Sequence, residues 1–427
     1  MKSPLIIFIL VFVLLIFLSC EGPQDEPEIT YSVNFQANGG NPEPAKQNVK
    51  FGGKVTQPDA MTKEGCFFDG WYKDNSYTNE WNFYNNTVTE NITLYARWVV
   101  APHIVQGVNF IEKLGWIASN AQNNGYYIIE ISNDITIDPV KLYYSNKIIF
   151  VEIRSIETTR TINLRNNVLL SMFEIQSGVT LILSNIELKG TTDKNVRNSL
   201  IDIKSGGSFI LDQGAKIYGH GGTTYLFGGG VYVSEKGYFY MYGGEISGNI
   251  AHSGGAVYIK GVFVMYDGVI YGNGSGSGGG VYVGEKSHFF MNGGEIKGNT
   301  SESYTGGGGG VYVGEKSYFY MDGGEIKGNT SGSYIDGGGG GVYIYNSVFN
   351  KTGGTIYGYT DGDSNSNAAK IDRGTDKGTL KQQAGHAICI GSYNSIFKDT
   401  TSGQDNNLYF NGTINPPAFS GTWDYKE

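Results

Sequence analysis

Cysteine and clustered basic residues are the two features that this sequence has least of. The 427 residues contain three cysteines, Cys20, Cys66 and Cys389, which lie far apart. These positions do not indicate a disulfide framework, and we expect Cys66 and Cys389 to be single buried thiols. The formal net charge is −9, and no lysine- or arginine-rich run occurs. This balance argues against nucleic acid and anionic lipid as partners.

Recognisable catalytic and cofactor motifs are also absent. The glycine runs precede strands rather than helices, so they are not phosphate-binding loops, and segment 361–365 lacks the later glutamate of a calcium loop. The remaining candidates are recurrent acids and scattered histidines: Asp267, Asp322, Glu245, Glu295, Glu325, His220, His252, His288 and His386. The glutamates recur from one repeat to another, which is typical of a solvated face, and the histidines lack metal-ligand spacing. We therefore predict no catalytic residue, no metal site and no cofactor.

What the sequence has in abundance is glycine, with 65 residues, much of it in a repeated phrase. The phrase Gly-Gly-Gly-Val-Tyr-Val at 228–233 recurs at 278–283 and 308–313, and at 339–344 with isoleucine in the last place; a looser copy lies at 254–259. Nearly all variation in repeat length lies in one connector, at 300–305 and 330–336. A period of about 20 to 50 residues predicts an array of stacked units, and insertions at one corner predict loops on one face.

Within each unit the apolar residues alternate, which predicts strands. Phe239 and Met241 share one face of their strand, and Val231 and Val233 share one face of theirs, with Tyr232 between them pointing outward. Glycines at the strand ends supply the positive φ of tight corners. Short strands that repeat one layer up predict a parallel β-helix. The recurrent asparagines predict a ladder of side-chain amides along one corner: Asn249, Asn273, Asn299 and Asn329.

Weaker copies extend the array on both sides, so we expect core coils from about 165 to 395. Segments 170–175 and 200–203 occupy the valine position upstream, and 385–390 adds one copy downstream. In the last full copy Lys351 replaces the methionine and Tyr359 the asparagine. Segment 107–124 is predicted to be a helix that covers the first coil. The prediction is based on five apolar residues at helical spacing: Val108, Ile111, Leu114, Ile117 and Ala121.

The N-terminus carries a short apolar stretch. One lysine precedes the apolar stretch 5–18, which is too short for a comfortable membrane span. The stretch ends at Leu18, and Ser19 and Cys20 follow it. This pattern resembles a bacterial lipoprotein signal peptide (1–20), with Phe17 where leucine is more usual. The resemblance implies a diacylated Cys20, a charged tether at 21–30, and anchoring in the outer membrane or at the cell surface, with the periplasmic leaflet as an alternative. An ordinary signal peptide or an uncleaved anchor stays open.

Residues 31–99 form a separate segment with three tryptophans, Trp71, Trp81 and Trp98, and alternating strands, which suffice for a compact core. The Gly70-Trp71 pair and the closing Leu-Tyr-Ala-Arg-Trp at 94–98 closely resemble the InlB B-repeat (Listeria–Bacteroides repeat) module. That family implies a small β-grasp-like domain of bacterial surface proteins. Cys66 departs from its pattern, in which an aromatic residue is usual.

The rest of the chain also contains segments that are similar to those of a known family. Segments 123–129 and 134–137, the glycine-rich coils, Gly385-His386-Ala387 and the closing 397–401 and 421–423 are together similar to treponemal β-helix lipoproteins. The resemblance covers about 105–425 and implies a pectate-lyase-like, right-handed parallel β-helix without an established reaction. The fold class expected is thus mainly β: a small β-grasp-like module, then a right-handed parallel β-helix with an N-terminal capping helix.

The outward tyrosines give the most specific functional hypothesis. They are expected to form one ladder: Tyr232, Tyr258, Tyr282, Tyr312 and Tyr343, with Tyr238, Tyr240, Tyr318 and Tyr320 on an adjacent face. An exposed aromatic strip on a membrane-tethered protein favours non-enzymatic binding or adhesion to a host protein, a glycan or an envelope component. The alternative for any single tyrosine is that it only packs. A polysaccharide lyase or glycoside hydrolase and a purely structural envelope protein stay open, and the sequence does not indicate the oligomeric state.

Overall fold

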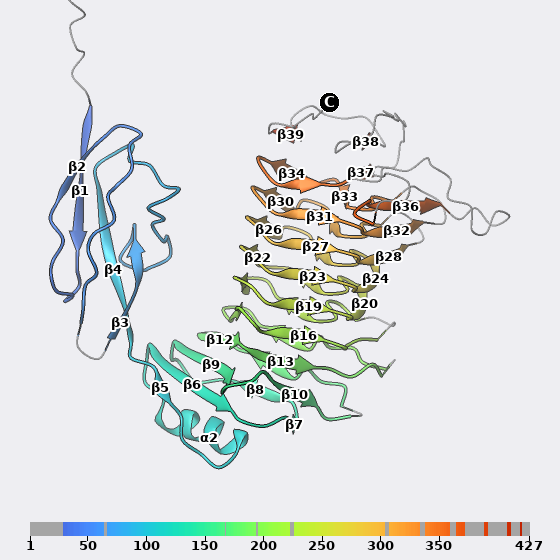
Figure 1. Cartoon of the computed structure of the whole chain (residues 1–427), viewed down its shortest axis with the longest axis horizontal. Helices are drawn as coiled ribbons and strands as arrows, with labels where there is room; N and C mark the ends of the chain where they lie inside the picture. The colour runs from blue at the N-terminus through green and yellow to red at the C-terminus, as the bar shows by residue number, and fades with distance from the viewer. Residues whose placement is uncertain are drawn as a thin grey trace, which may run out of the picture. The chain divides into compact units, whose positions relative to one another are not determined.

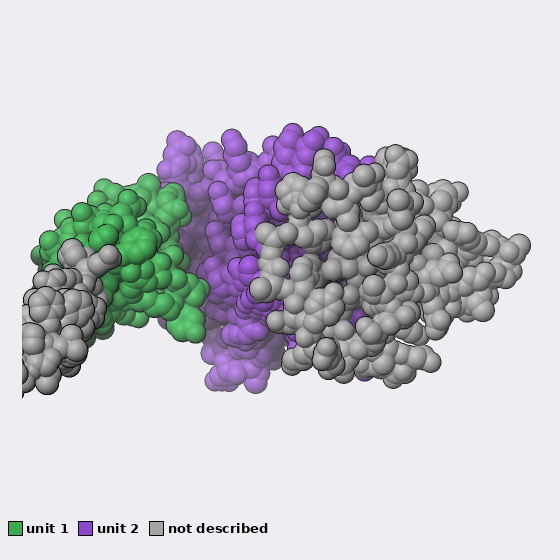
Figure 2. Space-filling view, turned by 90° about the horizontal axis from the view of Figure 1, so that it is seen from above, with its two compact units in different colours: residues 1–101 green, residues 102–427 purple. Residues whose placement is uncertain are grey.

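The computed structural model describes residues 29–358, with gaps at 64–65, 167, 194, 223–225, 304–306 and 334–337, and the stretches 364–371, 388–391, 408–410 and 419–420. The chain divides into two compact units, residues 1–101 and residues 102–427, which are green and purple in Figure 2. The expected signal peptide with Cys20, most of the expected tether, Tyr359, His386 and the segments 397–401 and 421–423 lie outside the described residues.

The N-terminal unit is a small β module, as predicted, and it contains one mixed sheet. Its strands β1 (Thr30–Gln36), β2 (Gln47–Lys50), β3 (Cys66–Tyr72) and β4 (Ile92–Val100) lie in the order β2-β1-β4-β3. The central strands β1 and β4 are parallel, and each edge strand is antiparallel to its neighbour. Trp71 and Trp81 are buried in the core, and Trp98 packs against it. Cys66, which we expected to be buried, is only partly buried.

The second unit is a parallel β-helix, which confirms the predicted fold class. Figure 1 shows its coils stacked one on the next, and three long parallel sheets run along the stack. We name these sheets after the residue that recurs on their buried faces: the phenylalanine, isoleucine and valine sheets. Parallel pairing begins at β5, so coils form upstream of residue 165, where we expected the first one.

The phenylalanine sheet consists, within the described residues, of β5 (His103–Ile104), β6 (Gly125–Ile131), β9 (Ile149–Ser155), β12 (Val179–Ser184), β15 (Ser208–Leu211), β18 (Tyr238–Met241), β22 (Val262–Met265), β26 (His288–Met291), β30 (Tyr318–Met321), β34 (Val348–Lys351) and β39 (Phe419–Ser420). The isoleucine sheet consists of β7 (Ile135–Ile137), β10 (Arg160–Leu164), β13 (Ile186–Lys189), β16 (Lys216–Tyr218), β19 (Glu245–Ser247), β23 (Val269–Tyr271), β27 (Glu295–Lys297), β31 (Glu325–Lys327) and β35 (Thr355–Ile356). The valine sheet consists of β8 (Val140–Leu142), β11 (Phe173–Ile175), β14 (Ile201–Ile203), β17 (Val231–Val233), β21 (Val257–Ile259), β25 (Val281–Val283), β29 (Val311–Val313), β33 (Val342–Tyr345), β37 (Ile388–Gly391) and β38 (Leu408–Phe410).

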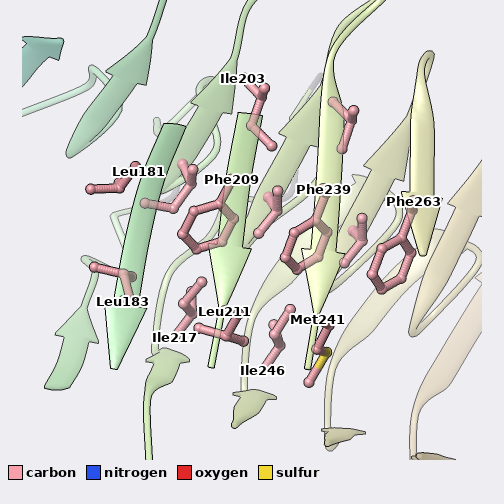
Figure 3. Packing of buried hydrophobic residues seen from close by; sticks show 14 of the residues in the cluster. Leu181, Leu183, Ile203, Phe209, Leu211, Ile217, Phe239, Met241, Ile246 and Phe263 are labelled. Atoms are coloured by element: carbon pink, nitrogen blue, oxygen red, sulfur yellow. The ribbon is translucent and has the colours of Figure 1, made fainter. Parts of the chain in front are cut away.

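Columns of like residues fill the interior of the β-helix. Neighbouring strands pair in register, so that Phe239 lies opposite Phe209 on one side and Phe263 on the other. The rings of this column stack with centroids 4.5–5.1 Å apart, close to the usual separation of paired strands. Figure 3 shows Phe209, Phe239 and Phe263 on successive strands, with Leu211 and Met241 below them in the view. The two weaker copies upstream, with Phe173 and Ile201, occupy the valine position as predicted.

A buried ladder of asparagines runs along the corner after the isoleucine sheet, as predicted. The Nδ2 of Asn249 donates to Oδ1 of Asn273 at 3.1 Å, and the same bond continues to Asn299 and Asn329 at 3.0 Å. Each Oδ1 also accepts from the backbone N–H of the preceding asparagine. The next rung is Asn367, which accepts from Asn329 at 3.0 Å. The repeat spacing put the position of this asparagine at Tyr359 and so did not indicate Asn367. The reason is an insertion between Ile356 and Asn367.

The predicted helix covers the N-terminal end of the β-helix, but its bounds and its buried face differ from the prediction. α2 (Phe110–Asn120) begins after Asn109, whose Oδ1 accepts from the N–H of Glu112 at 2.9 Å. Phe110 and Ile117 are buried and pack into the core, whereas Ile111 is exposed. Val108 precedes the N-cap and is 93% exposed, because it stands outside the helical register that we assumed.

A fourth parallel sheet was not predicted. It is formed by β20 (Ile250–Ser253), β24 (Gly274–Ser277), β28 (Thr300–Ser303), β32 (Thr330–Ser333) and β36 (Ala368–Ile371). The connectors that we interpreted as loops at 300–305 and 330–336 therefore begin as strands, and residues 304–306 and 334–337 lie outside the described residues. Their serine- and glycine-rich sequences carry little β propensity, so the pattern gave no signal of a sheet there.

Candidate functional site

The five predicted tyrosines form one continuous column on the outer face of the valine sheet. In register, Tyr232 pairs with Tyr258, and the order continues through Tyr282 and Tyr312 to Tyr343. Neighbouring rings are stacked, with centroids 4.6–5.6 Å apart and interplanar angles of 5–19°. The ladder geometry is as predicted.

The side chains of the ladder are less exposed to solvent than we predicted from the sequence. The rings of Tyr258, Tyr282 and Tyr312 are only partly exposed, and Tyr343 is buried at 5% exposure. Each interior ring lies between two others, so its faces are covered and its edge and hydroxyl are what a ligand could touch. In the interior of the column, the flat faces of the tyrosines are therefore not available to a partner.

The hydroxyls of the ladder are held in the protonated form. Burial raises the pKa of Tyr232, Tyr258, Tyr282 and Tyr312 above the ordinary value of about 10. Among the described residues, no hydrogen-bond partner is found for the hydroxyls of Tyr258, Tyr282 and Tyr312. These three groups can each donate and accept one or more hydrogen bonds at neutral pH.

A pocket of about 830 Å³ lies beside the ladder, at the corner between the valine and phenylalanine sheets. Its aromatic lining comes from both sheets: Tyr258, Tyr282, Tyr312 and Tyr345 on one side, and Tyr238 and His288 on the other. Burial lowers the pKa of His288, which favours the neutral imidazole. Sequence patterns did not predict this pocket, which is the candidate functional site.

The floor of the pocket is a turn that is shorter than the turns of the coils on either side. Four residues connect the valine and phenylalanine strands at 234–237, 284–287 and 314–317, but Lys260 and Gly261 alone connect β21 to β22. Gly261 lies against the turn below, where a Cβ would stand 2.3 Å from the carbonyl oxygen of Gly237. The shorter turn therefore recesses one coil between two that project, and this opens the pocket.

The turns around the pocket carry charges of both signs. Glu285 lies 3.2 Å from Lys286, and Glu315 lies 3.0 Å from Lys316. The charged lining consists of three carboxylates and three ammonium groups: Glu235, Glu285, Glu315, Lys236, Lys260 and Lys286. The pocket thus has no net charge, while its rim is strongly polar.

The second predicted tyrosine face is not a continuous ladder. Tyr238 and Tyr240 stack side by side on β18, as do Tyr318 and Tyr320 on β30. Between them, β22 places valines in register with Tyr238 and Tyr240. His288 stacks on Tyr318 with centroids 4.7 Å apart. Of this set, Tyr238 is the member that lines the pocket.

The candidate acids lie away from the pocket, and the glutamates are engaged in ion pairs. The glutamates lie on the outer face of the isoleucine sheet, where Lys216 contacts Glu245, and Lys327 contacts both Glu295 and Glu325. Hydrogen bonds from Lys297 and Lys327 lower the pKa of Glu295, which opposes a role as a general acid. Asp322 accepts from the hydroxyl of Thr352, and Asp267 accepts from the N–H of Gly268.

The histidines are likewise separate. His220 is buried between loops, with Nδ1 accepting from the N–H of Thr191 at 3.2 Å and Nε2 lying 2.9 Å from the carbonyl of Asn198. His252 lies near Phe227, with centroids 6.0 Å apart. Across the described part of the chain, no three His, Cys, Asp or Glu side chains are grouped so that they could hold a metal ion. Residues 361–363 of the calcium-loop-like segment lie outside that part.

Comparison with known proteins identifies the N-terminal unit. Residues 31–97 match the model of the Listeria-Bacteroides repeat domain, which confirms the predicted module. A "Putative Gly-rich membrane protein" of Evansella cellulosilytica is 39% identical over 75 residues, 18% of this chain and 9% of the relative. A "Putative membrane protein" of the same organism is 40% identical over 75 residues, 18% of this chain and 11% of the relative.

The chain thus matches only about a tenth of the length of these curated relatives. Neither relative's name specifies a ligand or a reaction. Within the described residues, no helix has the length and apolar character needed to cross a membrane.

Proposed function

We propose that this is a lipid-anchored surface protein whose β-helix binds a partner, without catalysis, through the pocket beside the tyrosine ladder. The observation that carries the proposal is the row of Tyr258, Tyr282 and Tyr312, whose protonated hydroxyls line a pocket of about 830 Å³. A pocket of this volume lies in the range, about 300–1,000 Å³, of sites that hold small ligands or ligand segments. A rigid scaffold with a polar, pre-formed pocket favours recognition over chemistry, since the candidate glutamates are ion-paired elsewhere.

Surface anchoring is supported by two independent features. The sequence Leu18-Ser19-Cys20 follows a short apolar stretch, and residues 31–97 belong to a repeat type that we associate with bacterial surface proteins. The relatives in Evansella carry membrane-protein descriptions.

Palmitate labelling of cells that produce the intact chain tests the anchor. We expect label on the unmodified protein and none on Cys20→Ala, and protease treatment of intact cells to remove the protein. Label that persists in Cys20→Ala would contradict lipidation at this residue.

Binding is tested with paired substitutions in the mature chain. Tyr282→Phe combined with Tyr312→Phe removes two hydroxyls and keeps the stacked rings, so we expect binding about tenfold weaker at unchanged stability. The matched control is Tyr266→Phe, a stacked tyrosine that does not line the pocket. Arrays of glycans and of matrix proteins provide the ligands. Binding that is equal in all three proteins would rule out the ladder as the binding surface, and release of unsaturated sugar products would instead indicate a lyase.

A further inference from the structure

The pocket exists because one coil departs from its neighbours. The turn at Lys260 and Gly261 is two residues shorter than the turns at 234–237 and 284–287 on either side. The strands β21 and β22 nevertheless keep the register of the neighbouring coils. The shorter turn thus leaves the pairing of this coil unchanged while it recesses the corner. A feature that shapes a surface without changing the pairing is well suited to recognition.

The lining groups define what chemistry fits. The hydroxyls of Tyr258, Tyr282 and Tyr312 both donate and accept, the lysines donate, and the glutamates accept. A ligand can pair with all three kinds of side chain if most of its own polar groups both donate and accept hydrogen bonds. Alcohol hydroxyls have this property, whereas phosphate and carboxylate groups only accept.

The charges of the pocket select against ionic ligands. Three carboxylates and three ammonium groups lie around it, so a polyanion would meet as many repulsive as attractive groups. Glu285 and Glu315 each already neutralise a neighbouring lysine. Electrostatic steering of a charged chain is therefore weak, and specificity would come from hydrogen bonds.

From these observations we propose that the recess at Lys260 and Gly261 is a subsite for an uncharged, hydroxyl-rich saccharide, a short segment of a neutral glycan. The inference rests on the proposed binding function and adds the place and the ligand class. The saccharide lies across the recessed coil, with its hydroxyls bonded to the ladder and to the flanking Glu–Lys turns.

The test fills the recess without changing the strands. Lys260 and Gly261 are replaced by Gly-Glu-Lys-Ser, the sequence of the turn at 284–287, in the intact mature chain. Because adjacent coils carry turns of this length, the variant should fold, with an unchanged melting temperature. Binding is measured by calorimetry with neutral cello-, malto- and chito-oligosaccharides, and with oligogalacturonate and heparin fragments as acidic probes. We expect the unmodified protein to bind a neutral probe and the filled variant to bind it at least about tenfold more weakly.

The outcomes separate this inference from the function on which it rests. Equal binding of a neutral probe by the filled and unmodified proteins would overturn the subsite but leave the binding function standing. Preference for the acidic probes, or binding of matrix proteins alone, would overturn the ligand class. If the unmodified protein binds no probe and no protein, both proposals fail. Should the filled variant not fold, Tyr258→Phe combined with Tyr282→Phe keeps the shape of the pocket, and unchanged affinity of that pair would equally overturn the subsite.

Discussion

The asparagine ladder shows how much one buried side chain can contribute when all its polar atoms are paired. The Nδ2 of Asn299 donates to the carbonyl of Ile270 at 2.9 Å and to Asn329 Oδ1 at 3.0 Å. Its Oδ1 accepts two hydrogen bonds from Asn273. Replacement by alanine would leave several of these buried groups without partners, and unpaired buried groups cost more than an average hydrogen bond contributes.

We therefore predict that Asn299→Ala lowers the free energy of unfolding by about 2–4 kcal/mol. Urea unfolding followed by circular dichroism measures this change. The control is Asn292→Ala, at an exposed position of the adjacent turn, where we expect a change within about 0.5 kcal/mol. Similar values for the two variants would mean that the ladder contributes no more than a surface residue.

We predict that His220 makes the stability of its region depend on pH. Burial lowers the pKa of His220 to about 4, because its neutral ring is enclosed and hydrogen-bonded on both nitrogens. The unfolded chain binds the proton near pH 6.5, so the folded state is favoured above that pH and loses stability as the pH falls towards 4. We expect a loss of up to about 1.4 kcal/mol per pH unit in this window.

Hydrogen exchange around 190–228, measured between pH 7 and pH 4.5 and corrected for intrinsic rates, tests the role of His220. His220→Gln removes the titrating group, so its pH dependence in this window should be flatter even if the variant is less stable overall. An identical slope in both proteins would show that other groups govern the acid response.

At the scale of strands and turns, the repeated glycines act mainly by allowing close approach. Only the first glycine of the phrase has positive φ in the copies at Gly228, Gly254 and Gly278. The second glycine, such as Gly279, lies where a Cβ would stand 2.3 Å from the carbonyl oxygen of Thr300 and 2.5 Å from that of Gly309. Our expectation that glycines serve the corner through positive φ thus holds for one residue of three in these copies and for none at Gly308 or Gly339. Contact between coils explains the second glycine.

Gly279→Ala should therefore destabilise the β-helix by at least about 1–3 kcal/mol through overpacking between coils. In the neighbouring strand β24, a Cβ at Gly274 would meet only Thr300 Oγ1 at 3.5 Å, so Gly274→Ala is the matched control and should be neutral. Thermal melts of the two variants and the unmodified protein distinguish them. Equal melting temperatures would refute close approach as the reason for the second glycine.

Strand positions could be predicted from the sequence wherever the repeat is regular, because a fixed spacing with alternating apolar residues admits one register. That spacing placed Phe239, Val231 and the tyrosine ladder correctly. It failed where stacking rather than local pattern makes the structure. The fourth sheet has no apolar alternation, and the rung at Asn367 follows an insertion. The pocket depends on a turn shorter by two residues, whose effect appears only when neighbouring coils project beside it.

At the scale of the molecule, the β-helix is nearly one-dimensional, and each coil contacts its two neighbours. The in-register pairing of Val257 with Val281, and of Val281 with Val311, means that one coil can take the place of the next. Stability of such a stack is the sum of coil and interface contributions. A coil should therefore be removable as a unit, whereas a part of a coil should not.

Deletion of residues 281–310 joins Gly280 to Val311 and restores the glycine–valine phrase, with Tyr258 stacking on Tyr312 and Asn273 bonding to Asn329. We predict a folded protein, less stable than the original, with a β-helix shorter by about 5 Å, one strand separation, in small-angle scattering. Deletion of residues 281–295 removes half a coil and joins Gly280 to Ile296, which leaves that coil without its valine and phenylalanine strands. That control should fail to fold, because the valine and phenylalanine columns would be interrupted. If both deletions fold equally well, register between coils does not determine the structure, and the columns are a consequence of the fold and not its cause.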